Sequence, residues 1–144
     1  MTNLLIVYHS QGGNTEAMAK AVYEGALSSG AEVNLKRAVE TKSDDIINCD
    51  GIIIGTPDYF SYMAGMIKDL FDRVWYTIRG KVENKPYALF CSAGGGSKKS
   101  LERLDGLCQY LKLEKVFDDV VARGQPSAEV LEECRKMGRK LAEL

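Results

Sequence analysis

Residues 4–22 read LLIVYHSQGGNTEAMAKAV and change character twice within nineteen positions. The apolar run at 3–9 is typical of a strand covered on both faces. From Thr15 to about Ser29, small and apolar residues recur on one helical face, and Gly30 supplies a stop signal. The residues between them are polar or glycine, and a simple turn needs fewer of these. The stretch therefore predicts a buried strand that leads through a polar loop directly into a helix.

The rest of the chain repeats this alternation of strand and helix. Further strands are predicted at 32–40, 51–55, 85–92 and 114–124, and further helices at 43–47, 66–78, 101–111 and 126–144. Five such units predict an α/β fold, a flavodoxin-like doubly wound five-stranded parallel sheet in the order 2-1-3-4-5 with helices on both faces. No linker or repeat divides the chain, so we expect one domain, 1–144.

Composition excludes several classes of protein. The 144 residues carry a net charge of −1, which argues against a nucleic-acid partner. No basic leader and no apolar stretch of membrane-spanning length is present, so we expect a cytoplasmic protein without a membrane span. The four cysteines are far apart and mostly lie within apolar patterns, which favours buried reduced thiols over disulfides or metal ligands. No metal site is expected.

Three loops should meet at one edge of this sheet. In the order 2-1-3-4-5 the ligand crevice lies where the winding direction reverses, at the carboxyl ends of strands 1 and 3. The loops after strands 1, 3 and 4 are then neighbours: SQGGNT (10–15, the first loop), TPDYFS (56–61, the second loop) and SAGGGS (92–97, the third loop). We therefore expect a ligand site between them.

The first loop suits an anion. Ser10 and Thr15 offer hydroxyl donors, Asn14 offers an amide, and Gly12 and Gly13 let backbone N–H groups turn inward at the positive end of a helix dipole. The loop contains no lysine or arginine, so a phosphate would be held by neutral donors. The alternative is a glycine turn that caps a helix.

The second loop suits a flat ring. Tyr59, Phe60 and Tyr62 follow Pro57 closely, and loop aromatics can stack on a ligand or simply cover the end of the sheet. Asp58 could accept a hydrogen bond from an imide-type N–H or cap the turn. Both interpretations stay open for each residue.

The third loop permits a close approach of backbone to a ligand through its consecutive glycines, or is a plain flexible turn. It is not a P-loop, because Lys98 stands where that motif requires glycine before Lys-Ser. No G-x-G-x-x-G follows any strand either. His9 is the only histidine, and we interpret it as a packed residue with no catalytic relay.

These motifs resemble the flavodoxin-like FMN-binding family over essentially the full length of the chain. The signature positions matched within IVYHSQGGNTEAMAKAV (6–22) are Tyr8, Ser10, Gly13, Thr15, Ala19 and Val22. GTPDYFSYMAGMIKDLFDR (55–73) resembles the isoalloxazine loop and following helix of one branch of the family. That branch contains the tryptophan-repressor-binding-protein-like NAD(P)H:quinone oxidoreductases and related FMN reductases.

The resemblance implies FMN as the cofactor and names the residues around it. The phosphate would lie on Ser10, Gln11, Gly12, Gly13, Asn14 and Thr15. The ring would meet Thr56, Pro57, Asp58, Tyr59, Phe60, Ser61 and Tyr62, with Ser92, Ala93, Gly94, Gly95 and Gly96 along its other edge.

Two departures leave the role within this family open. Electron-carrying flavodoxins are usually strongly acidic, whereas this chain is nearly neutral. The quinone oxidoreductases of the branch are longer and assemble as tetramers through added segments that find little room here. We expect an FMN redox protein that transfers electrons to a redox partner protein or to a small acceptor such as a quinone. The alternatives are an NAD(P)H-dependent quinone or flavin reductase and a flavin-free interaction module. A monomer or a dimer is expected.

Overall fold

Strands and helices alternate along the chain in the computed structural model, which describes residues 2–95 and 98–144. The strands are β1 (Asn3–Tyr8), β2 (Glu32–Arg37), β3 (Gly51–Tyr59), β4 (Tyr62–Met63), β5 (Pro86–Ala93), β6 (Glu114–Lys115) and β7 (Val120–Arg123). The helices are α1 (Asn14–Ser28), a 3-10 turn at Ala38–Glu40, α2 (Ser43–Asn48), α3 (Gly65–Ile78), α4 (Lys99–Tyr110) and α5 (Ala128–Ala142).

The sheet confirms the predicted α/β class. Parallel strands follow the order β2-β1-β3-β5, and both β6 and β7 pair with β5. The predicted order 2-1-3-4-5 thus holds for the first four parallel strands. The predicted count of five strands is wrong, because the described residues form seven.

Two local features account for the extra strands. The predicted fifth strand, 114–124, leaves the sheet between β6 and β7, where Asp118 and Asp119 keep their carboxylates at the surface or in ion pairs. Lys115 Nζ lies 2.8 Å from Asp119 Oδ1 across this break. The seventh strand, β4, is a short antiparallel return of the chain onto β3.

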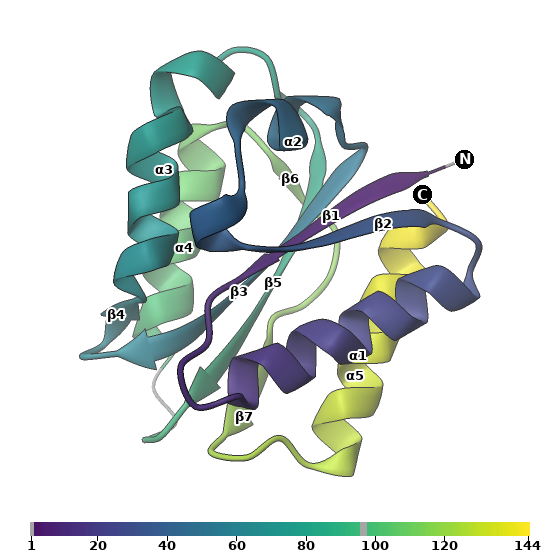
Figure 1. Cartoon of the computed structure of the whole chain (residues 1–144), viewed down its shortest axis with the longest axis vertical. Coiled ribbons are helices and arrows are strands. Elements are labelled where there is room, and N and C mark those ends of the chain that lie inside the picture. The colour runs from purple at the N-terminus through teal and green to yellow at the C-terminus, as the bar shows by residue number, and fades with distance from the viewer. Residues whose placement is uncertain (1, 96–97) are drawn as a thin grey trace.

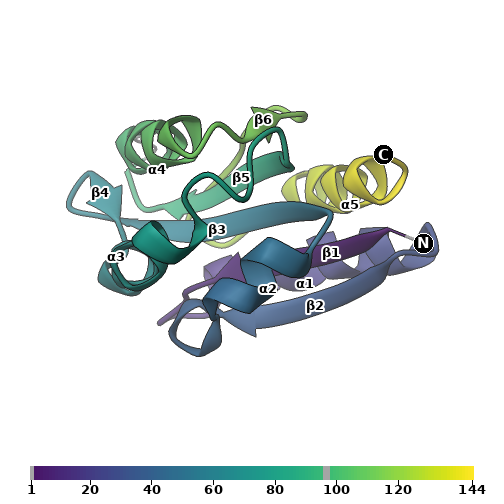
Figure 2. The ribbon, with the colours of Figure 1, turned by 90° about the horizontal axis from the view of Figure 1, so that it is seen from above.

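Helices cover both faces of the sheet, as Figures 1 and 2 show. Along β1, Leu4, Ile6 and Tyr8 face the core shared with α1 and α5. Leu5 and Val7 face the opposite core, which α2, α3 and α4 close. Both sets are buried, so the continuous apolar run of β1 reflects a central strand with two packed faces.

Helices α1 and α5 pack closely through two glycines. A Cβ atom at Gly25 of α1 would lie 2.0 Å from the carbonyl oxygen of Arg135. A Cβ atom at Gly138 of α5 would lie 2.1 Å from the carbonyl oxygen of Val22. The helix backbones therefore approach too closely for any side chain at either position. This contact fixes the placement of α1, whose first turn forms part of the ligand site.

Two further observations concern the predictions from composition. All four cysteines are free and buried, as expected. Among residues 2–95 and 98–144, no helix combines the length and apolar character needed to cross a lipid bilayer.

Candidate cofactor site

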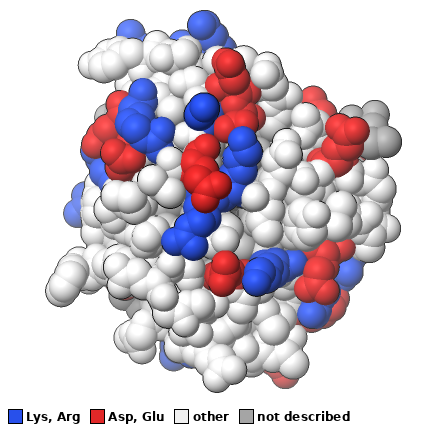
Figure 3. Space-filling model, in the orientation of Figure 1, with Lys and Arg blue, Asp and Glu red and all other residues white. Residues whose placement is uncertain are grey.

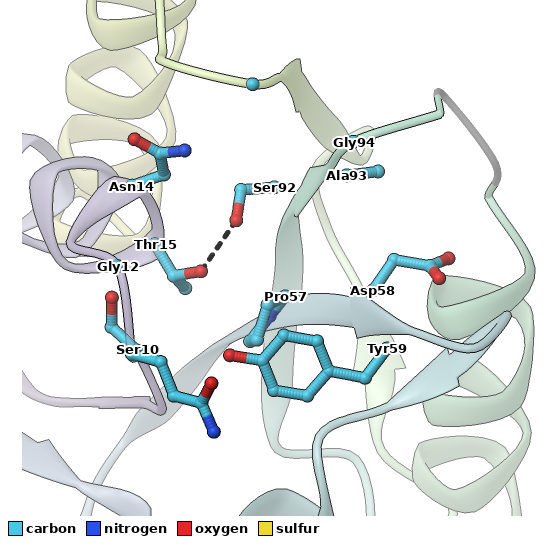
Figure 4. Close-up of a pocket in the computed structure, with 12 residues that line it drawn as sticks. Ser10, Gly12, Asn14, Thr15, Pro57, Asp58, Tyr59, Ser92, Ala93 and Gly94 are labelled. Carbon is cyan, nitrogen blue, oxygen red and sulfur yellow. Dashed lines mark hydrogen bonds between the residues drawn. The ribbon is translucent and has the colours of Figure 1, made fainter.

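A cleft opens at the carboxyl ends of the central strands, where the three loops meet (Figure 4). It is lined by Ser10, Gln11, Gly12, Asn14, Thr15, Pro57, Asp58, Tyr59, Ser92, Ala93, Gly94 and Gly124. The cleft lies at the carboxyl ends of β1 and β3, which is where doubly wound sheets bind their ligands.

The first loop turns around Gly13, whose φ of 99° places it in the left-handed region. Gly13 precedes α1 and has no side chain with which to cap the first turn of the helix. Its own N–H donates to Ser10 Oγ over 3.1 Å, which closes the loop on itself. The first-turn N–H groups and the positive end of the α1 dipole are therefore directed toward the cleft without a capping side chain.

A pair of buried hydroxyls joins the first loop to the third. Thr15 is 1% exposed and Ser92 is 8% exposed, and their hydroxyl oxygens lie 2.7 Å apart. Figure 4 shows this bond spanning the cleft wall between α1 and β5. One hydroxyl must donate to the other, so the pair retains one O–H for a ligand. Two residues 77 positions apart are thus aligned as one donor site.

The second loop is shorter than predicted, because β3 does not end at residue 55. Parallel pairing with β5 continues to Pro57, which faces Ser92, and β3 itself runs to Tyr59. The chain then reverses through Phe60 and Ser61, whose φ angles are 57° and 61°, into β4. The Ser61 N–H donates to Asp58 Oδ1 over 2.9 Å, so Asp58 stabilises this tight turn.

Thr56 serves the loop rather than the cleft. It is wholly buried, and its hydroxyl donates to the Pro57 carbonyl over 2.7 Å while accepting from the Ala64 N–H over 2.9 Å. Both hydrogen-bonding capacities are used within the protein. Thr56 does not line the cleft, although the sequence placed it among the residues of the ring site.

The predicted aromatic residues separate into two groups. Tyr59 lines the cleft, and Figure 4 shows its ring along the wall opposite the Thr15–Ser92 pair. Phe60 is fully exposed at the turn, and Ser61 and Tyr62 are exposed beside it. These three do not line the cleft, and their contact with a ring stays a prediction.

The third loop contributes its first three residues to the lining of the cleft. Ser92, Ala93 and Gly94 line the cleft, whereas Gly95 is exposed outside the lining and Gly96 lies outside the described residues. Gly13 too is absent from the lining, since it forms the turn behind it.

One lining residue escaped the sequence analysis. Gly124 follows β7, has a φ of 70°, and donates its N–H to the Ala93 carbonyl over 3.0 Å. A glycine at the end of the fifth predicted strand was a usable signal, because that strand ends at the same edge of the sheet.

No lysine or arginine lines the cleft among the described residues. A basic side chain does contact the first loop: Arg37, at the end of β2, donates from Nη2 to the Ser10 carbonyl over 3.4 Å. Burial and the charge of Arg37 lower the pKa of His9 from its usual 6.5. Sequence reasoning missed Arg37, because β2 is remote from the first loop along the chain.

A doubly wound sheet in this strand order, with a ligand cleft at its switch point, is the flavodoxin-like fold. The NADPH-dependent FMN reductase family matches residues 27–126. Since this match covers more than half of the 144 residues, the chain belongs to that family. The resemblance described from the sequence is confirmed.

Individual relatives support the same grouping. A flavodoxin of Aquifex aeolicus (strain VF5) is 32% identical, over 99% of this chain and 86% of that protein. An NAD(P)H dehydrogenase (quinone) of Brucella ovis is 29% identical, over 100% of this chain and 97% of that protein. A solved flavodoxin from the domain Archaea superposes with a TM-score of 0.87 at 22% identity, covering 99% of this chain and 97% of that one.

The predicted function and cofactor are confirmed at the level of the family: the chain is a flavodoxin-like redox protein whose cofactor is FMN. The cleft fits this molecule. The neutral donors at the N-terminus of α1 suit a phosphate, and the Tyr59 ring offers a flat apolar wall.

Proposed function

We propose that FMN binds in this cleft with its phosphate on the first loop and its ring beside Pro57 and Tyr59, and that the chain transfers electrons through it. The observation that carries the proposal is the buried Thr15–Ser92 hydroxyl pair, 2.7 Å apart, next to the uncapped first turn of α1. A buried polar pair with one O–H left over needs a further acceptor, and a phosphate oxygen supplies one.

The bound flavin supplies the redox chemistry. Thr15, Ser92 and the N–H groups of the first turn bind the phosphate, Tyr59 orients the ring, and the β3–β4 turn holds Tyr59 in place. Tyr59 and Ser92 lie at the carboxyl ends of β3 and β5, two largely buried strands, whereas Thr15 and the first-turn N–H groups belong to α1. The protein's part is therefore to bind and orient the cofactor.

Our main proposal is that the chain is an electron carrier. It would exchange electrons with a redox partner protein or with a small acceptor such as a quinone. This proposal does not rest on an acidic docking surface, because acidic and basic side chains are interspersed on the face shown in Figure 3.

A reductase that uses NAD(P)H is the second candidate, supported by the 29% identity to the Brucella ovis quinone dehydrogenase. That alignment spans 195 positions, whereas this chain has 144 residues, so about 51 aligned positions have no counterpart here. If this chain is a reductase, it works without those additional segments of the relative.

We further propose that residues 1–144 act as one domain, as a monomer or a dimer, in the cytoplasm. Four free, buried cysteines support a reducing compartment. Light scattering of the FMN-bound protein measures the oligomeric state directly.

Titration with FMN and riboflavin tests the site. Replacing Thr15 by Ala should weaken FMN binding by about 1.5–3 kcal/mol, the value of a hydrogen bond to a charged group, and leave riboflavin unchanged. Thr77→Ala, at an exposed position of α3, is the matched control. Equal losses for both ligands would contradict a phosphate role, and a wild-type protein that takes up no FMN would refute the assignment of the cleft.

Turnover separates the two candidate roles. The FMN-bound protein is mixed with NADPH or NADH and a quinone, and consumption of the nicotinamide is followed. Sustained turnover assigns the reductase role. Lack of turnover, together with reductive titration in two resolved one-electron steps, assigns the carrier role.

A further inference from the structure

His9 does not line the cleft, but it packs against Tyr59, a residue that does. It directly follows β1, is half-buried, and donates its backbone N–H to the Gly55 carbonyl of β3 over 3.3 Å. Its imidazole meets the Tyr59 ring edge-on, with centroids 6.3 Å apart and planes at 83°. Such edge-to-face contacts are the favoured geometry of aromatic pairs. The only histidine of the chain therefore packs against the aromatic residue that lines the cleft.

Arg37 contacts the residues on either side of His9. Its guanidinium donates to the Ser10 carbonyl over 3.4 Å and lies over the Tyr8 ring, 5.9 Å from the centroid. Tyr8 in turn donates its hydroxyl to Glu16 in the first turn of α1 over 3.1 Å. Residues 8–10 are thus held from β2 on one side and from α1 on the other.

We propose that His9 is a positioning residue: its imidazole supports the Tyr59 ring at the wall of the flavin cleft, and Arg37 holds the backbone that carries it. This inference rests on the proposed function, since it concerns the flavin that Tyr59 would orient. It assigns a role to the one residue between β1 and the first loop that phosphate binding leaves unused.

The charges around His9 agree with an aromatic role. The groups that face this region are Arg37 from β2, Tyr8 from β1, Glu16 from α1 and Tyr59 from β3. Burial and then Arg37 lower the pKa of His9, so the imidazole is uncharged at neutral pH. An uncharged ring packs edge-on against Tyr59 without requiring a carboxylate partner.

The first test needs no flavin. Because His9 is the only histidine, its imidazole proton signals can be identified directly in the NMR spectrum of the flavin-free protein. Tyr59→Leu removes the neighbouring ring and should shift these signals, whereas Tyr76→Leu, at an exposed position of α3, should not. Signals that stay unchanged in Tyr59→Leu would overturn the contact.

The second test asks whether the contact reaches the flavin. His9→Leu should weaken FMN and riboflavin by the same factor, about two- to tenfold from the loss of one aromatic pair, and should alter the visible absorption of the bound flavin. His9→Phe keeps an aromatic edge and should restore both properties. A loss confined to FMN, or no rescue by His9→Phe, would overturn the proposal. If the wild-type protein bound no flavin, the proposed function would fail while the NMR contact stood, so the two failures are distinguishable.

Discussion

Replacing Gly25 by Ala tests whether the α1–α5 contact is as tight as the structure indicates. The added Cβ would lie 2.0 Å from the Arg135 carbonyl oxygen, and ordinary contact begins at 3.4 Å. The helices would therefore have to separate by roughly 1.4 Å, because the obstructing atom belongs to a helix backbone and cannot rotate away.

The expected loss follows from two opposing contributions. Overpacking costs about 1–3 kcal/mol, more where backbone must shift, and the better helix propensity of Ala returns about 1 kcal/mol. Because the obstructing atom is backbone, we take the upper end of that cost, about 3 kcal/mol, and expect a net loss of about 2 kcal/mol in the free energy of unfolding. For a protein near this size, each kcal/mol lowers Tm by about 2–4 °C, so Tm should fall by roughly 4–8 °C.

Gly106→Ala is the matched control for thermal unfolding. Gly106 also lies within a helix, α4, but a Cβ there would meet no atom within 4 Å. This variant should gain about 0.5–1 kcal/mol from helix propensity alone. The double variant Gly25→Ala, Gly138→Ala should lose less than the sum of the single losses, because one separation of the helices relieves both clashes. If Gly25→Ala unfolded at or above the wild-type temperature, the close contact would be refuted.

Three further predictions concern single side chains. Thr56→Val leaves the buried Ala64 N–H without an acceptor, so urea unfolding should show a loss of about 1–3 kcal/mol. Burial raises the pKa of Cys49 and of Cys91 to about 11, so a thiol reagent at pH 8 should react with them only after denaturant is added, and rapid reaction in the native protein would contradict their burial. The pKa of His9 is lowered from 6.5 on folding, so its contribution to stability is complete above pH 6.5 and is lost as pH falls through the folded pKa. The urea midpoint of the wild-type protein should accordingly fall relative to that of His9→Phe as the pH is lowered below 6.5.

Elements whose signal lies within one segment were predicted well. The run 3–9 became β1, and the small-residue face that follows became α1 from Asn14 to Ser28. The first loop was identified as a group of neutral donors, and the structure places five of its six residues in one cleft with Ser92. These features depend on local periodicity and on turn chemistry, both of which are readable from short windows of sequence.

Features decided by distant partners were missed. Thr56 to Tyr59 resemble a loop because they include Pro57 and an aspartate, yet β5 on one side and β4 on the other hold them in β3. Arg37 belongs to an edge strand, and only the folded sheet shows that it contacts the first loop. Long-range pairing overrides local propensity at such positions, so no single window of sequence could identify them.

The contact between α1 and α5 has a consequence for the order of events during synthesis. The first loop and α1 leave the ribosome early, but the face of α1 that carries Gly25 is covered only when residues 128–142 are available. The side chain of Thr2 donates to the Leu144 carbonyl over 3.3 Å, and Figure 1 shows both chain ends on the same side of the molecule. No residue of α5 lines the cleft. The phosphate site proposed at the first turn of α1 would therefore be held in place only after α5 has been made, because α5 packs against α1.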